Sequence, residues 1–233
     1  MKILAFETSA KAGSVALLNG ETLLGESYCN TGLTHSQTMM PMAEQLLKIC
    51  GMTPGDVDAV AVAAGPGSFT GVRIGVAAAK GFAWGGEIPC YGVSTLEAMA
   101  LGLGVDQGYV LPVMDARRQQ VYNALFHFAG GTAERLCPDR AISLEDLAEE
   151  IKNLSEHVFL VGDGSVLCYN TLKGRVPQLV LPSEHRMHQR AAGVGLAALQ
   201  MIARGETGDG AALQPNYLRL SQAERERLAR EQR

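Results

Sequence analysis

The sequence has no excess of positive charge. Its 20 Lys and Arg residues are outnumbered by 24 Asp and Glu residues, which gives a net charge of −4. This composition does not favour non-specific binding to nucleic acid or to an anionic membrane. If the protein serves RNA, we therefore expect the RNA to be held only through a complex with a partner.

Paired cysteines and long hydrophobic runs are also missing. The five cysteines are odd in number, widely spaced and without a Cys-x-x-Cys pair, so they indicate neither a disulfide framework nor a thiolate zinc site. Glu7 interrupts the first apolar run before a signal-peptide core could form, and no later stretch reaches the roughly 18 apolar residues that span a bilayer. We expect a soluble, cytoplasmic protein that makes no membrane contact.

The sequence contains none of the common catalytic motifs. It has no Gly-x-Ser-x-Gly, no His-Glu-x-x-His and no cysteine with an evident histidine partner. His185 and His188 have a spacing that metal sites use, but no third ligand stands out. Asp115, Arg117 and Arg118 follow a predicted strand, and an aspartate that bonds its own turn explains them better than a substrate clamp. We predict no catalytic residue and no metal site.

What the chain does contain is typical of a compact α/β protein. Its 233 residues, 47% of them hydrophobic, can bury the core of one large domain or two small ones. The 27 glycines exceed the usual share of roughly 7% and lie between apolar segments, which indicates tight turns.

A break in the pattern at 102–108 divides the predicted elements into two domains, 1–105 and 106–233, with a charged tail over 221–233. The last helix could cross back onto the first domain. In the first half we predict strands over 3–9, 14–19, 22–29, 58–64 and 88–93, and helices over 34–50, 70–84 and from Ser94. In the second half we predict strands over 109–114, 120–128, 134–142 and 158–162, and helices from Ser143 and over 165–173 and 191–204.

Two loops have the composition of phosphate-binding turns. Thr8 and Ser9 follow the first strand, and Gly65, Gly67 and Ser68 join a buried strand to a helix, where free backbone N–H groups can face an anion. The second loop matches neither a Walker loop nor Gly-x-Gly-x-x-Gly. Tight turns that only connect strands and helices would look the same.

Two predicted helices carry more apolar residues than one buried face needs. The helix over 34–50 has one stripe with His35, Met39, Met42 and Leu46 and a second stripe with Met40, Ala43 and Leu47. The helix over 70–84 is apolar nearly all round. One stripe can face the sheet while the other binds a partner, although a helix covered on both sides within its own domain would show the same pattern.

The motifs together resemble the TsaB (YeaZ) family over nearly the whole chain. They are the start Ile3-Leu-Ala-Phe-Glu-Thr-Ser9, Thr34-His-Ser, Gly65-Pro-Gly-Ser-Phe-Thr-Gly-Val-Arg-Ile-Gly75, Gly92-Val-Ser-Thr-Leu96, Asp115-Ala-Arg117 and Pro215-Asn-Tyr-Leu-Arg219. The resemblance implies a two-domain fold of the actin, hexokinase and Hsp70 (ASKHA) type. Its first domain should hold a mixed five-stranded sheet flanked by helices, and its second should be smaller and less regular.

The resemblance also implies a role in placing a threonylcarbamoyl group on the adenosine beside the tRNA anticodon. In that machinery the TsaB-like subunit is a non-catalytic partner of TsaD, the ATPase TsaE joins them, and an isolated copy pairs with itself. Thr95 and Met99 stand where TsaD has the two metal-binding histidines. We therefore expect no intrinsic cofactor, with ATP and metal on the partner subunits, although weak nucleotide binding at the two loops stays open.

The family pairs through the first two helices of the N-terminal domain. The residues expected on this surface are His35, Met39, Met42, Leu46, Arg73, Val76, Ala77 and Lys80. The alternative is a stand-alone phosphotransferase of the same fold, in which Gly162-Asp-Gly-Ser165 would form a second nucleotide loop.

Overall fold

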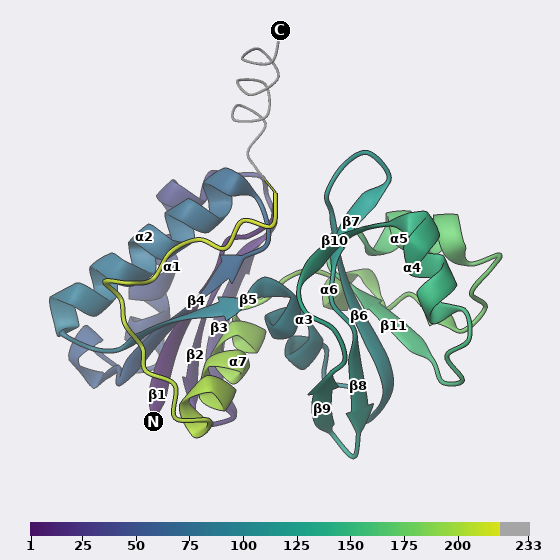
Figure 1. Cartoon of the computed structure of the whole chain (residues 1–233). Helices are drawn as coiled ribbons and strands as arrows, with labels where there is room; N and C mark the ends of the chain where they lie inside the picture. The colour runs from purple at the N-terminus through teal and green to yellow at the C-terminus, as the bar shows by residue number, and fades with distance from the viewer. Residues whose placement is uncertain (220–233) are drawn as a thin grey trace, which may run out of the picture.

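The structure is a computed structural model and describes residues 1–219; the predicted tail over 221–233 lies outside the described residues. The chain forms two α/β domains that lie side by side, each built around one sheet (Figure 1). This arrangement confirms the predicted fold class.

The first domain contains a mixed five-stranded sheet in the order β3-β2-β1-β4-β5. β2 is antiparallel to β1 and β3, whereas β4 is parallel to β1 and β5. The strands predicted over 14–19 and 22–29 are confirmed as an antiparallel pair. The strands are β1 (Lys2–Glu7), β2 (Gly13–Asn19), β3 (Thr22–Cys29), β4 (Ala59–Gly65) and β5 (Cys90–Ser94).

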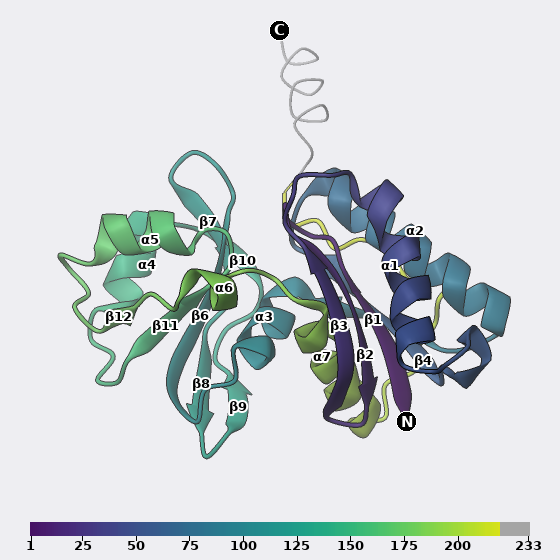
Figure 2. The same cartoon turned by 180° about the vertical axis from the view of Figure 1, so that it is seen from behind.

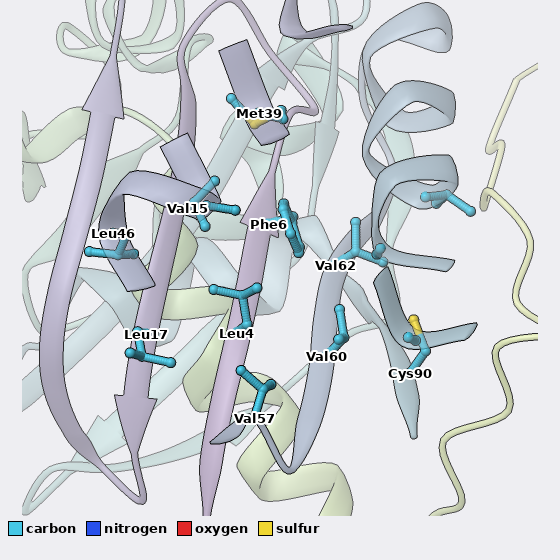
Figure 3. Packing of buried hydrophobic residues seen from close by; sticks show 14 of the residues in the cluster. Leu4, Phe6, Val15, Leu17, Met39, Leu46, Val57, Val60, Val62 and Cys90 are labelled. Carbon is cyan, nitrogen blue, oxygen red and sulfur yellow. The ribbon is translucent and has the colours of Figure 1, made fainter. Parts of the chain in front are cut away.

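Alternating side chains of this sheet point to two helical layers. Leu4 and Phe6 pack with α1 and α2 in one cluster that includes Met39 and Leu46 (Figure 3), while Ile3 and Ala5 pack with α7 on the opposite face. Seen from behind, α1 and α2 form the outer layer, away from the second domain (Figure 2). The helices and the short 3-10 turn of this domain are α1 (His35–Ile49), η1 (Pro54–Asp56), α2 (Phe69–Gly86), α3 (Thr95–Leu103) and α7 (Ala191–Ala203).

The second domain has a sheet in the order β10-β7-β6-β11-β12, with β8 paired to β6 and β9 to β8. The strand predicted over 120–128 is two strands, because buried Asn123 turns its amide to the Ala124 carbonyl. The strand predicted over 134–142 is also two, with Pro138, which has no N–H to donate, between them. The elements are β6 (Gln107–Asp115), β7 (Gln120–Asn123), β8 (Phe126–Ala129), β9 (Thr132–Arg135), β10 (Arg140–Ser143), α4 (Leu144–Ile151), β11 (Val158–Val161), α5 (Ser165–Leu172), β12 (Leu179–Val180) and α6 (Glu184–Met187).

Helix α7 crosses back onto the first domain. Val194, Ala197 and Ala198 are fully buried against β1, β2 and β4 and beside α3. The range 106–233 therefore does not form one domain, and the first domain is discontinuous in sequence. The small side chains of α7 explain its position, because they allow a helix to lie close to a flat sheet.

The chain after α7 returns along the outside of α2 as an extended segment, here named the C-terminal strap (residues 205–219), which is drawn in yellow in Figure 1. The Asn216 N–H donates to the Ala64 carbonyl (2.6 Å). Arg219 at the end of the strap donates to the Ala116 carbonyl of the second domain (2.7 Å). The strap thus connects the outer helix layer to the opening between the domains. Within residues 1–219, no helix is both long and apolar enough to cross a membrane.

Candidate functional site

Most of the residues predicted for partner binding, Ala77 excepted, do not form the outer face of α1 and α2. Met39, Leu46 and Val76 are 1%, 5% and 5% exposed and belong to the core, so their assignment to the partner surface is wrong. The sheet is shaped to receive them, since a Cβ at Gly13 would lie 2.8 Å from both Met39 Cε and the His35 ring. Of the two apolar stripes on α1, the one with Met39 and Leu46 is therefore the internal one.

The other predicted residues of α1 are also engaged internally. His35 is half-buried, with its Nε2 2.8 Å from the Ala10 carbonyl oxygen, and Met42 is partly buried against the core. Both α1 stripes contribute to the core, because Ala43 and Leu47 are buried as well. Of the residues in the two stripes, Met40 is the one that remains exposed, at 43%.

Arg73 and Lys80 of α2 hold the C-terminal strap. Arg73 Nε donates to the Tyr217 hydroxyl (2.8 Å), and the guanidinium carbon lies 3.8 Å from the centre of the Phe69 ring. Lys80 Nζ donates to the Ala211 and Leu213 carbonyls of the strap, at 3.3 and 3.1 Å. Both polar head groups, predicted for a partner, thus bind this chain's own backbone and side chains.

Large apolar side chains nevertheless remain exposed on this outer layer. Trp84 is 86% exposed, Ile49 73% and Met40 43%. Ala77 and Gly81, one and two helical turns along α2 from Arg73, are also exposed and provide a shallow surface leading to Trp84. We name this outer surface the helix face and define it by Met40, Pro41, Ala77, Gly81, Phe82 and Trp84.

Two hollows flank the helix face. One, of about 870 Å³, lies between α1 and α2 and is lined by Met40, Pro41 and Phe82 among others. The other, of about 440 Å³, lies between Trp84 and Ala211 of the strap. Gly81 and Ile88 line both hollows, so a protruding partner side chain could enter on either side of α2. Sequence reasoning missed Trp84, although the small residues Ala77 and Gly81 on the same helix stripe were a usable signal.

The two loops predicted to bind phosphate pack on each other. Thr8 Oγ1 donates to the Gly71 carbonyl (2.8 Å), and the Ser68 N–H donates to the Ser9 carbonyl (2.6 Å). Ser68 Oγ accepts the Gly71 N–H at the start of α2. A Cβ at Gly67 would lie 2.6 Å from the Ser9 carbonyl oxygen. The Thr8 hydroxyl and the Ser68 and Gly71 N–H groups are thus bonded within the protein.

Gly65 has a similar structural role. Its φ is +120°, and a Cβ there would meet the Asn216 carbonyl oxygen at 2.3 Å, so glycine is required for the strap to pass. Among the predicted phosphate-binding residues, only Ser9 has a buried side-chain oxygen without a partner in the described chain. Ser9 lines a cavity of about 510 Å³ between the domains.

The interdomain cavity is acidic inside. Asp115 and Asp163 line it, and Glu7 lies fully buried beside Ser9, whose N–H donates to Glu7 Oε1 (2.5 Å). Burial raises the pKa of Glu7 from 4.5 to about 7, because a charged carboxylate loses its hydration there; the Ser9 hydrogen bonds lower this pKa only in part. The Asp115 prediction is confirmed, since its Oδ1 accepts the Arg117 N–H of its own turn (2.7 Å).

Within residues 1–219, no group of three or more His, Cys, Asp or Glu side chains is arranged to hold a metal ion. Thr95 and Met99 are 0% and 3% exposed inside the packing of α3. A hydroxyl and a thioether in this apolar environment are poor ligands for a hard cation.

The fold places the chain in a broad class. The ROK hexokinase from Thermus thermophilus aligns with a TM-score of 0.51 at 12% identity, covering 87% of this chain and all of that one, which shows a shared two-domain ASKHA fold. The family model described as TsaD, tRNA N6-adenosine threonylcarbamoyltransferase, matches residues 31–226.

Closer relatives narrow this class. The tRNA threonylcarbamoyladenosine biosynthesis protein TsaB of Bacillus subtilis is 35% identical over 227 residues, covering 96% of each chain. The structure of YeaZ from Pseudomonas aeruginosa aligns with a TM-score of 0.72 at 27% identity, covering 93% of this chain and 99% of that one. The chain belongs to the TsaB (YeaZ) family, within the wider TsaD family.

Proposed function

We propose that this chain acts in tRNA threonylcarbamoyladenosine formation as a non-catalytic subunit that binds TsaD through its helix face. The name of the Bacillus subtilis relative supports the pathway. The observation that carries the proposal is Trp84, which is 86% exposed on the helix face and lines the apolar hollow between α2 and the strap. A large aromatic side chain at the centre of an apolar surface is the usual anchor of a protein interface.

A supporting rather than catalytic role agrees with what surrounds α3. Thr95 and Met99 cannot supply imidazole ligands, and both side chains are buried. The loops beside the cleft are closed by their own hydrogen bonds. We therefore propose that ATP and metal are bound by partner subunits, with TsaE supplying the ATPase, and that this chain has no cofactor of its own.

The helix face is suited to helices of the same kind. Ala77 and Gly81 leave no large side chain beside Trp84, so a partner helix can approach α2 closely while Trp84 and Met40 enter its surface. TsaD belongs to the same wider family, so its own outer helices are the proposed occupant, and a second copy of this chain takes their place in isolation.

Size-exclusion chromatography with light scattering tests this proposal on the full chain, alone and mixed with TsaD, and then with TsaE and ATP. We expect a homodimer that gives way to a heterodimer, and loss of both with Trp84→Glu. Val166→Glu, at a 48% exposed apolar residue of α5, is the matched control and should pair like the wild type. A Trp84→Glu variant that still pairs, or a wild-type chain that stays monomeric with TsaD, would overturn the proposal.

No observation favours the stand-alone phosphotransferase. The Gly162-Asp-Gly-Ser165 turn packs on β6, where the Gly164 N–H donates to the Val113 carbonyl (3.1 Å). Calorimetry with ATP and Mg²⁺ separates the alternatives, since tight binding with turnover would contradict a non-catalytic subunit.

A further inference from the structure

Four cationic side chains gather at the opening of the interdomain cavity. Lys11 follows β1, Arg117 and Arg118 lie in the β6–β7 turn, and Arg219 ends the described strap. Lys11, Arg117 and Arg219 line the cavity, and Arg118 is exposed next to them. The β6–β7 turn and the end of the strap lie at the same end of the molecule, on opposite sides of the opening (Figure 1). We name these four residues the basic rim.

The basic rim is largely free of partners for its charges. Over residues 1–219, the ion pair between Arg117 and Asp115 (3.4 Å) is the sole salt bridge formed by any of the four. The side chain of Arg117 stays 86% exposed despite that pair. A chain with a net charge of −4 therefore has a local excess of positive charge at this opening.

The backbone of the β6–β7 turn adopts an energetically unfavourable conformation that holds its two arginines outward. Arg117, Arg118 and Gln119 have φ values of 64°, 57° and 58°, a left-handed run that non-glycine residues rarely adopt. Hydrogen bonds fix this conformation, from the Arg117 N–H to Asp115 and from the Leu144 N–H to the Gln119 carbonyl. Strain of this kind is typical of sites where a side chain must be held in a set position.

The charge distribution favours a long anion over a small one. Asp115 and Asp163 line the cavity, so a small phosphate placed beside them would be repelled. The cations lie at the opening and come from three separate segments, which suits successive phosphates of one strand. Tyr217, stacked on Phe69 with ring centres 4.7 Å apart, is 38% exposed at the same opening and offers a surface for a base.

We infer that the basic rim binds the phosphate backbone of RNA, and that this chain itself contacts the tRNA substrate. This inference rests on the proposed function, which makes the RNA a tRNA. It departs from the expectation, drawn from net charge alone, that only a partner would hold the RNA.

The test measures the binding of a labelled tRNA transcript to the full chain in complex with TsaD, by fluorescence anisotropy across a salt series. The rim variant is Lys11→Gln with Arg117→Gln and Arg118→Gln. Its control is Lys152→Gln with Lys173→Gln and Arg204→Gln, which removes the same charge from exposed positions elsewhere. We expect at least a tenfold loss of affinity in the rim variant, a salt dependence flatter by roughly 2 in log K against log salt, and no change in the control.

Equal tRNA affinity of the rim variant and its control would overturn the inference, as would displacement of the tRNA by ATP, which would indicate a nucleotide site instead. A wild-type complex that does not bind tRNA would also overturn it.

Complex formation and threonylcarbamoylation, measured in parallel, separate the two proposals. A wild-type chain that neither pairs with TsaD nor supports modification refutes the proposed function, whereas unchanged tRNA binding by a rim variant that pairs normally refutes only this inference.

Discussion

The buried carboxyl group of Glu7 makes the stability of the fold depend on pH. Glu7 ends β1 with no exposed surface, and its Oε2 has no hydrogen-bond partner in the described chain. Burial raises its pKa to about 7, whereas the unfolded chain has the ordinary value of 4.5. Between these values the folded state holds a proton that the unfolded state has released, so the free energy of unfolding must fall as the pH rises.

The size of this effect follows from the two pKa values. Each pH unit between them removes about 1.4 kcal/mol, so the contribution of Glu7 is complete below about pH 4.5 and about 3 kcal/mol of it is lost by pH 7. Glu7→Gln has nearly the same shape and does not ionise. We therefore expect the free energy of unfolding of Glu7→Gln, relative to the wild type, to rise by about 2.5 kcal/mol between pH 5 and pH 8.

Urea unfolding followed by far-ultraviolet circular dichroism, at half-unit steps from pH 5 to pH 8, measures this difference. Glu134→Gln, on an exposed part of β9, controls for the loss of one negative charge and should follow the wild type at every pH. Parallel profiles of Glu7→Gln and the wild type would refute the reasoning, because they would show that Glu7 is ionised in the folded protein throughout.

Three further predictions concern the packing of the first domain and the attachment of the strap. Met39→Ala should cost about 2 to 5 kcal/mol of unfolding free energy, since Met39 is 1% exposed, whereas Met40→Ala, 43% exposed, should cost under about 0.5 kcal/mol; urea unfolding measures both. Gly75→Ala should destabilise by about 1 to 3 kcal/mol because its Cβ would lie 2.2 Å from Thr8 Oγ1, and a double-mutant cycle with Thr8→Ala should show a combined loss below the sum of the two. Lys80→Met should speed thermolysin cleavage within 205–219 by removing two hydrogen bonds to the strap, which mass spectrometry can follow, and unchanged cleavage would contradict that role.

Much of the fold could be predicted from local patterns. The neighbouring strands predicted over 14–19 and 22–29 and the helices predicted from Ser94 and Ser143 are confirmed, because each depends on residues close in sequence. The break after Asn123 escaped prediction because the inward turn of Asn123 depends on its burial and on Arg140, 17 residues away. Local periodicity carries no information on such contacts.

The same limit explains the errors at the candidate site. Helix α1 has two apolar stripes, and its sequence alone does not say that the Met39 side meets the sheet. The orientation of α1 depends on Gly13 in β2, which has no side chain and so leaves room for Met39. The two loops predicted to bind phosphate are joined by a hydrogen bond between Thr8 and Gly71, which are 63 residues apart. No local motif reveals such a contact.

The most direct test of the account is the mass of the assembly formed by the full chain with TsaD, for the wild type, Trp84→Glu and Val166→Glu. We predict a heterodimer for the wild type and for Val166→Glu, and separate proteins for Trp84→Glu with its circular dichroism spectrum unchanged. A heterodimer of undiminished stability with Trp84→Glu would contradict the central claim that this subunit binds TsaD through the helix face.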